Sequence, residues 1–227
     1  MAKKKEAVAE ATTQEPVAAE LDPKEVISKS LLKTGRQGVE DLIDYMEEIG
    51  FFDAPCSGGN HLCEPGGLAR HSVNVMFIAE KMSVSLLGGT NITDEIRNSV
   101  VIAALLHDLG KCGDYGKALY VANMIKDGKP TLKEPEQKYK QSEKKPWKRN
   151  PDLSNVPHAV RSIKIATLFI DLTENEEWAI LTHDGLYDFM KYEIPGHETW
   201  LSMLIHWADM WASHIIEGSI NEESEGE

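Results

Sequence analysis

The sequence is poor in cysteine, with only three in 227 residues, and their spacing is not that of a metal-binding motif. An odd number this small argues against a disulfide framework and favours a reducing compartment, so we expect a cytoplasmic protein. No run of about 18 apolar residues is present, which argues against a membrane-spanning helix. Acidic residues outnumber basic ones by 37 to 24. The net charge of −13 argues against nucleic-acid binding through overall charge, although a local basic site stays open.

Hydrophobic residues make up 41% of the chain, which is enough to form one buried core. Residues 1–20 are dominated by Ala, Glu, Thr and Pro, so we expect a disordered N-terminal tail. The basic residues at its start are not followed by the apolar stretch of a secretory signal. We expect residues 21–217 to form a single domain and residues 218–227 to form an acidic C-terminal tail.

Apolar residues recur at helical spacing along most of this domain and predict an all-α fold. Asp22 before Pro23 is a typical helix start. Thr173 with Glu176 is typical of a capping box. The predicted helices span about 23–32, 37–48, 68–87, 156–171, 173–182 and 198–217, with one more that starts after Thr93.

Residues 113–155 differ from the rest of the domain, because ten of the 24 Lys and Arg lie here against six acidic residues. The Asp127-Gly128 pair between two extended-looking arms predicts a β-hairpin. Tyr139 and Trp147 lie among the lysines. This basic insert is therefore either a lid that holds an anionic substrate and stacks a base on an aromatic ring, or a solvated hairpin with exposed charges.

Polar side chains stand at the ends of apolar helices. His107 and Asp108 follow the run 100–106, which is apolar on every side and so marks a central helix. An ionised aspartate there is costly unless it is paired or binds a metal; the alternative is that both residues sit at an exposed helix end. Three more helices place His or Asp at an apolar position and favour a shared site: His71, His183 and Asp209. Imidazole with carboxylate suits iron, manganese, cobalt, nickel or zinc better than calcium.

The order His71, then His107-Asp108, then Asp209 resembles the H…HD…D signature of the HD-domain metal-dependent phosphohydrolases. The segments "HDLGK" and "LIHWADMWA" are similar to the central and last motifs of that family, and the resemblance covers about residues 36–217. The segment "HLCEPGGLARHSVNV" is also similar to the entry of the HD domain in a bacterial 3′–5′ exoribonuclease family. The resemblance implies an all-α helical bundle, here with a small β-hairpin insertion after the HDxGK motif.

The same resemblance implies a divalent-metal site. Its four ligands would be His71, His107, Asp108 and Asp209. Some members of the family hold a second ion, for which His158 in "VPHAVRSI" and His183 in "ILTHDG" are the candidates, with Asp108 as the bridge. The alternative is that these two histidines line the cleft and bind phosphate. We expect one or two divalent ions, which could be Fe, Mn, Co, Ni or Zn, with Mg also open. A water bound to such an ion loses its proton near neutral pH and becomes the nucleophile.

Several further residues are candidates for contact with substrate. Lys111 either reaches the substrate phosphate, as a catalytic residue beside Asp108, or complements the dipole at the end of its helix. Arg161 lies one helical turn from a predicted ligand and is a candidate phosphate clamp. His61 in the entry segment and Trp147 in the basic insert are the other substrate-binding candidates.

Two residues next to predicted ligands have two interpretations each. Asp184 follows His183 and either orients that histidine or caps a turn. His206 precedes Asp209 by about one helical turn and either borders the site or is structural. Cys112 follows the central motif, but no neighbouring residue suggests a base dedicated to it, so we interpret it as incidental.

These predictions lead to a metal-dependent phosphohydrolase that cleaves a phosphorylated small molecule, with a nucleotide as the first candidate, by attack of a metal-bound hydroxide. One alternative is a 3′–5′ exonuclease on single-stranded nucleic acid, which the entry segment and the basic insert favour and the acidic net charge opposes. Another alternative is a metal-binding module without turnover. We expect no membrane partner. The exact substrate, the number of ions and the oligomeric state stay open, because one fold hosts many functions.

Overall fold

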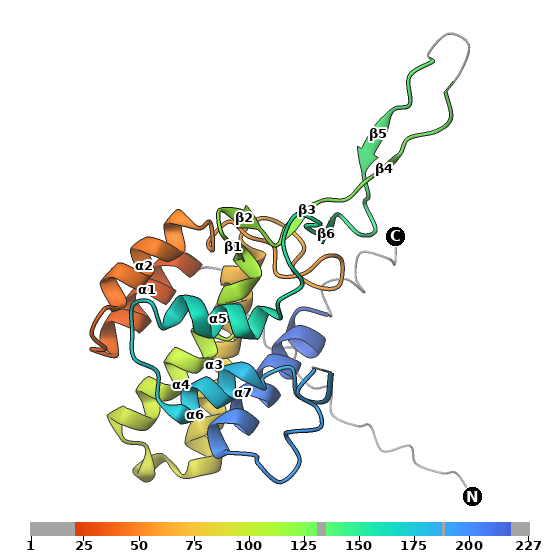
Figure 1. Ribbon diagram of the computed structural model, residues 1–227. Coiled ribbons are helices and arrows are strands. Elements are labelled where there is room, and N and C mark those ends of the chain that lie inside the picture. The colour runs from red at the N-terminus through yellow and green to blue at the C-terminus, as the bar shows by residue number, and fades with distance from the viewer. Residues whose placement is uncertain (1–20, 131–134, 188, 219–227) are drawn as a thin grey trace, which may run out of the picture.

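The computed structural model describes residues 21–130, 135–187 and 189–218. The predicted N-terminal tail and residues 219–227 of the predicted acidic tail lie outside the described residues. Within the described part, helices dominate and strands are short, so the fold is mostly α, which agrees in part with the predicted all-α fold (Figure 1). The helices are α1 (Pro23–Lys33), α2 (Val39–Glu48), α3 (Gly67–Leu87), α4 (Asp94–Leu106), α5 (His158–Ala166), α6 (Glu174–Leu181) and α7 (Trp200–Trp211).

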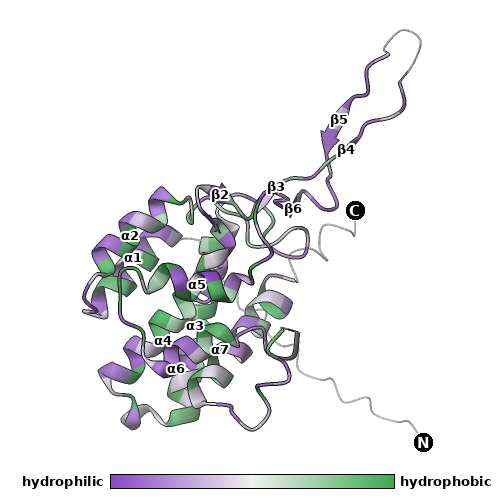
Figure 2. Ribbon diagram, in the orientation of Figure 1, coloured by the Kyte–Doolittle hydropathy of each residue, from purple (hydrophilic) through white to green (hydrophobic). Residues whose placement is uncertain are grey.

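Helix α4 lies at the centre of the helical bundle. Its residues 99–106 are all buried, because α3 packs along it and α1, α5, α6 and α7 also contact it. Figure 2 shows apolar segments in α3 and α4, the two helices in the middle of the body. The run 100–106 is apolar on every side because none of its sides faces solvent. None of the described helices is long and apolar enough to cross a membrane.

The predicted caps are present at three helix starts. Asp22 caps α1 and Thr93 caps α4, and each side chain accepts a backbone hydrogen bond from the first turn. Thr173 and Glu176 form a reciprocal capping box at the start of α6. These local signals fix where the helices begin.

Two predicted helices are shorter than expected. The helix predicted over 156–171 is α5, which begins at His158 because the residue before Pro157 is driven into an extended conformation. It ends at Ala166, after which the backbone N–H groups of Leu168 and Phe169 bond carbonyls three residues back (3.2 and 3.1 Å) in a tighter turn. The helix predicted over 198–217 is α7, followed by a π-helical turn over Ala212–Ile216.

The basic insert contains three short antiparallel strand pairs. They are β1 (Gly113–Asp114) with β2 (Lys117–Ala118), β3 (Tyr120–Ala122) with β6 (Trp147–Arg149), and β4 (Met124–Lys126) with β5 (Tyr139–Gln141). In the last pair Met124 lies opposite Gln141 and Lys126 opposite Tyr139. A tight turn at Asp127-Gly128 was expected, and this expectation is wrong, because the whole segment 127–138 joins β4 to β5.

The two halves of this hairpin have different surroundings. The inner pair, β3 and β6, lies against the loop before α3: Trp147 N donates to the carbonyl of Gly58 (3.2 Å), and its indole N–H donates to the carbonyl of Cys63. The outer pair, β4 and β5, is exposed throughout and projects away from the helical body (Figure 1). In this structure the outer pair therefore does not cover the helical body as a lid.

A buried ion pair joins three parts of the bundle. The carboxylate of Glu176, at the start of α6, accepts hydrogen bonds from both terminal nitrogens of Arg36 (2.8 and 3.0 Å). It also accepts from Ser99 Oγ of α4 (2.7 Å) and from the backbone N–H of Thr173 (2.8 Å). Burial alone would raise the pKa of Glu176, but the Arg36 hydrogen bond, supported by those from Thr173 and Ser99, lowers this pKa below its usual value of 4.5.

Replacing Glu176 by alanine is expected to lower the free energy of unfolding by about 3 kcal/mol, since it leaves the partners of a buried charge unpaired. The folded-state pKa is lowered, so this contribution is present above pH 4.5 and is lost as the pH falls through the folded-state value. Urea unfolding of wild type and variant at pH 7 and at pH 3.5 measures both effects. Glu174→Ala, at an exposed position of the same turn, is the control. An equal difference at the two pH values would contradict the prediction.

Candidate metal centre

Six side chains predicted as metal ligands converge at one place between the helices. They come from the second turn of α3, the C-terminal end of α4, the first residue of α5, the segment after α6 and the last turns of α7. They are His71, His107, Asp108, His158, His183 and Asp209. The apolar helices hold these side chains in place, since four of the six are buried inside the core.

The first group of donors surrounds the Oδ2 side of Asp108. His71 Nε2 lies 3.1 Å from Asp209 Oδ1 and 3.5 Å from Asp108 Oδ2. His107 Nε2 lies 3.3 Å from His71 Nε2 and 3.4 Å from Asp108 Oδ2. Two imidazoles and two carboxylates therefore face a common point.

The second group surrounds the other oxygen of the same carboxylate. His158 Nε2 lies 3.2 Å from Asp108 Oδ1, and His183 Nε2 lies 3.4 Å from it. The two Nε2 atoms are 3.1 Å apart, and Asp184 Oδ2 lies 3.3 Å from His158 Nε2. Asp184 therefore adds a carboxylate to this group and does more than cap a turn. Asp108 stands between the two groups with one oxygen toward each.

The spacing of these atoms fits ligands of a metal better than hydrogen-bonded pairs. Two atoms bound to one ion at about 2.1 Å lie roughly 3.0–3.4 Å apart at tetrahedral or octahedral angles. A charge-assisted N–H to carboxylate hydrogen bond is shorter, roughly 2.7–2.9 Å. Asp108 is 1% exposed, and neither of its oxygens has a hydrogen bond of normal geometry within the described chain. Burial of a carboxylate without such hydrogen bonds costs free energy, and a bound divalent cation would offset this cost.

The orientation of the histidine rings also suits metal binding. His107 Nδ1 lies 2.7 Å from the carbonyl of Ala104, and His183 Nδ1 lies 2.7 Å from the carbonyl of Ile180. A carbonyl only accepts, so both rings carry their proton on Nδ1 and present a free Nε2. His206 Nδ1 in turn lies 2.7 Å from the carbonyl of His183. His206 therefore supports the segment that holds a ligand and is not itself in the donor groups.

Lys111 is paired with the central carboxylate. Its Nζ lies 2.6 Å from Asp108 Oδ2, and the lysine side chain is 15% exposed. Burial alone would lower the pKa of Lys111, but the carboxylate of Asp108 raises it well above the usual value. Burial would likewise raise the pKa of Asp108, but Lys111 and His107 hold it well below the usual range. The centre therefore holds a fixed negative charge with a fixed positive charge beside it.

Gly110 of the "HDLGK" motif is needed for the contact between α4 and α5. A Cβ at this position would lie 2.1 Å from the carbonyl of His158. Its backbone N–H donates to Ser162 Oγ (2.8 Å), and that hydroxyl also bonds the carbonyl of His107. The close approach brings His158 within reach of Asp108.

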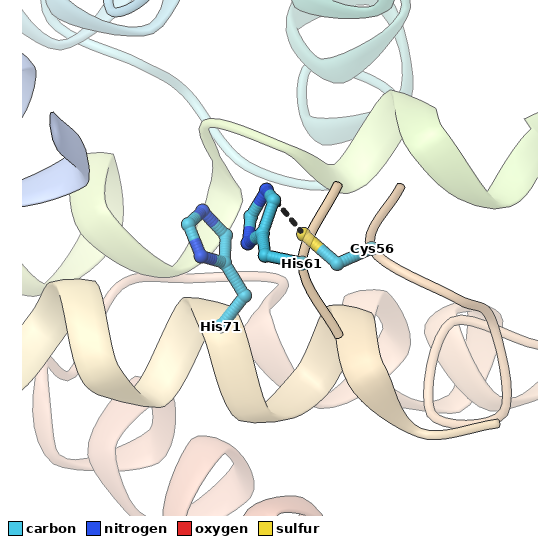
Figure 3. A group of neighbouring side chains, drawn as sticks. All are labelled: Cys56, His61 and His71. Atoms are coloured by element: carbon cyan, nitrogen blue, oxygen red, sulfur yellow. Dashed lines mark hydrogen bonds between the residues drawn. The ribbon is translucent and has the colours of Figure 1, made fainter. Parts of the chain in front are cut away.

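His61 lies beside the first group of donors (Figure 3). Its ring centre is 5.1 Å from that of His71, and its Nε2 faces Cys56 Sγ at 3.9 Å. Its Nδ1 contacts the carboxylate of Glu217. Burial lowers the pKa of His61, but the hydrogen bonds to Cys56 and Glu217 outweigh this and raise the pKa to about 9. The candidate substrate residue of the entry segment is thus next to the centre.

Two other candidates lie outside the centre. Arg161 is 2% exposed, and its guanidinium donates to Asp114 Oδ2 (3.1 Å) and to the carbonyl of Ser154 (2.8 Å). It ties the insert to α5, so the structure does not bring it into the position of a phosphate clamp. Trp147 of β6 is half-buried against the loop before α3, where its indole N–H donates to the carbonyl of Cys63. Its predicted stacking on substrate stays a prediction.

Sequence reasoning missed two residues at the centre, Cys56 and Glu217. Cys56 is fully buried and lies within ligand distance of His61 and His71 as one donor group. Glu217 is 2% exposed and contacts both of these histidines. No spacing signal could have found Glu217, because a regular helix would not turn it toward Asp209.

A helical bundle that gathers histidine and aspartate around a buried carboxylate is typical of a metal-binding domain. Residues 68–161 match the family model of the HD domain. This part of the chain therefore matches an HD domain, which supports the predicted resemblance to the HD-domain metal-dependent phosphohydrolases. His183 and Asp209 lie beyond the matched residues. No curated protein and no solved structure matches the chain.

Proposed function

We propose that the protein is a metal-dependent phosphohydrolase that cleaves a phosphate ester of a nucleotide or a related small molecule. The observation that carries this proposal is the buried carboxylate of Asp108, whose two oxygens face two separate groups of histidines. The cation of Lys111 lies beside it. Such a donor set suits one or two divalent ions, and the adjacent cation suits an anionic substrate. HD domains typically belong to metal-dependent phosphohydrolases.

The residues of the centre have separate roles in this proposal. When bound, a divalent ion would polarise a phosphate oxygen and lower the pKa of a bound water. The histidines of the two groups and Asp209 would hold the ions, with Asp108 between them. Lys111, fixed beside Asp108, directs positive charge at the phosphate. His61, 13% exposed at its side chain, borders the centre and contacts the substrate there.

Single-stranded nucleic acid is the second candidate substrate. The outer hairpin of the insert, β4 and β5, projects from the body and exposes Lys126, Lys140 and Tyr139. Cations with an exposed aromatic ring can contact the backbone and the bases of a single strand. This observation favours the exonuclease alternative over a module without turnover, which offers no role for the projecting hairpin.

A panel of mononucleotides, dNTPs, cyclic nucleotides and end-labelled RNA, each assayed with Mn²⁺, Mg²⁺, Co²⁺ or Fe²⁺, tests the proposal. We expect hydrolysis of at least one small nucleotide with a divalent ion and none with chelator. The double variant Lys126→Glu/Lys140→Glu is the matched control, since it should slow RNA cleavage and leave nucleotide hydrolysis unchanged. Cleavage of RNA alone would favour the exonuclease. Metal binding without turnover on any substrate would contradict both enzyme proposals.

A further inference from the structure

The π-turn after α7 changes the direction in which the side chain of Glu217 points. Asp209 and Glu217 are eight residues apart, and at about 100° per residue a regular α-helix would separate their directions by roughly 80°. The π-turn over Ala212–Ile216 is closed by the hydrogen bond from Glu217 N to Ala212 O (2.9 Å). It takes up one extra residue, which reduces the separation to roughly 20°. Glu217 therefore faces the same side as Asp209.

On this side the carboxylate of Glu217 meets three donors. Both of its oxygens lie 3.0 Å from His71 Nδ1, Asn74 Nδ2 donates to Oε1 (3.0 Å), and His61 Nδ1 contacts Oε2. Glu217 is 2% exposed, so these contacts replace water completely. They are the polar neighbours that a buried carboxylate requires.

An ionised carboxylate only accepts hydrogen bonds, so both imidazoles must present an N–H at Nδ1. In the neutral form of either ring, Nε2 on the far side then holds the lone pair that could bind a metal. His71 Nε2 faces Asp209 and Asp108, and His61 Nε2 faces Cys56. Figure 3 shows the two rings side by side, with His61 between His71 and the sulfur. One acceptor therefore sets the proton position of two rings at once.

We propose that Glu217 is a positioning residue, brought to the centre by the π-turn, that holds His71 as a metal ligand and His61 as a substrate contact through their Nδ1 atoms. The inference rests on the proposed function, because it concerns the ligand and substrate roles of these two histidines. The proposed role of Glu217 also accounts for the π-turn, because π-turns inside helices frequently accompany functional sites.

Glu217→Gln tests the proposal with little change in shape. The glutamine amide has one acceptor oxygen, and its NH₂ group faces the second imidazole N–H as a donor. We expect divalent-metal affinity to fall by about 10- to 100-fold, the usual loss when the partner of a ligating histidine is removed. Titration calorimetry of the metal-free full chain with Mn²⁺ or Zn²⁺ measures it. In the Zn²⁺ form, long-range ¹H–¹⁵N spectra should show His71 protonated at Nδ1 in the wild type, and a loss of this signature in the variant.

Two further variants separate positioning from general stability. Asn74→Ala removes the third hydrogen bond to the same carboxylate without touching either ring, so metal affinity should stay within about threefold. Insertion of one alanine after Ile215 keeps every ligand and Glu217 itself, but turns Glu217 about 100° away. We expect this insertion to weaken metal binding as much as Glu217→Gln does, and it replaces that variant if Glu217→Gln does not fold.

The outcomes distinguish this proposal from the proposed function. Wild-type metal affinity and an unchanged His71 signature in Glu217→Gln would overturn the role of Glu217 while leaving the phosphohydrolase intact. Unchanged affinity in the insertion variant would overturn the role of the π-turn. Metal binding that depends on Glu217, together with no hydrolysis of any substrate, would support the positioning role and contradict the proposed function.

Discussion

The Asp108→Asn variant is expected to weaken metal binding at both positions and to lose at least about a thousandfold in hydrolysis rate. The amide has a single oxygen, so it can face only one of the two donor groups, and its NH₂ group would point at the other cation. Loss of one electrostatic stabiliser alone typically costs about 10²- to 10³-fold in rate, and here the ions that activate water would be lost as well. Elemental analysis of protein purified without chelator, with the hydrolysis assay, measures both effects.

Asp184→Asn is the matched control for this variant. Asp184 lies 3.3 Å from His158 Nε2 and 3.7 Å from His183 Nε2, both in the second group, so its replacement is expected to affect at most one ion. Thermal unfolding of both variants checks that they fold, since Asp108→Asn leaves the cation of Lys111 without its partner. A full complement of tightly bound ions in Asp108→Asn would show that this carboxylate is not the shared ligand.

The His183→Ala variant is expected to reduce the metal content from two ions to one. His183 belongs to the second group through its Nε2 contacts with Asp108 Oδ1 and His158. The first group, around His71 and His107, lacks none of its donors in this variant. Hydrolysis should fall by roughly 10²-fold or more, since one of two cations that stabilise the phosphate is lost.

His197→Ala serves as the control, because His197 is exposed and lies outside both donor groups. It should keep the wild-type metal content and rate. One ion in the wild type and one in His183→Ala would contradict the two-ion arrangement. In that case His158 and His183 would keep the other role considered for them, as residues that line the site and bind phosphate.

The ligand candidates could be predicted because each carries a local signal. A polar residue on a helix that is otherwise apolar is visible without knowledge of the fold, as for His71 on α3 and Asp209 on α7. The HD motif follows a run of residues that the structure buries completely. Helix starts were predictable for the same reason, since Thr93 and Thr173 act within one turn of themselves.

Features that depend on distant partners were not predictable. Arg161 was a candidate for phosphate binding on the basis of the sequence alone. In the structure it donates to Asp114 of the short strand β1 and so links this strand to α5. The indole N–H of Trp147 bonds the carbonyl of a residue 84 positions away in sequence, a contact that the sequence did not indicate. Glu217 depends on a π-turn that no spacing rule anticipates.

The ligands of the centre come from chain segments that begin at α3 and end at α7, almost the full length of the domain. An ion held there would act as a cross-link between helices that are far apart in the unfolded chain, so it would bind the native state alone. At a free concentration about 100 times the dissociation constant, such binding adds about 2.7 kcal/mol to folding. Removal of the ion by a chelator would then lower the stability of the helical bundle as well as stop hydrolysis.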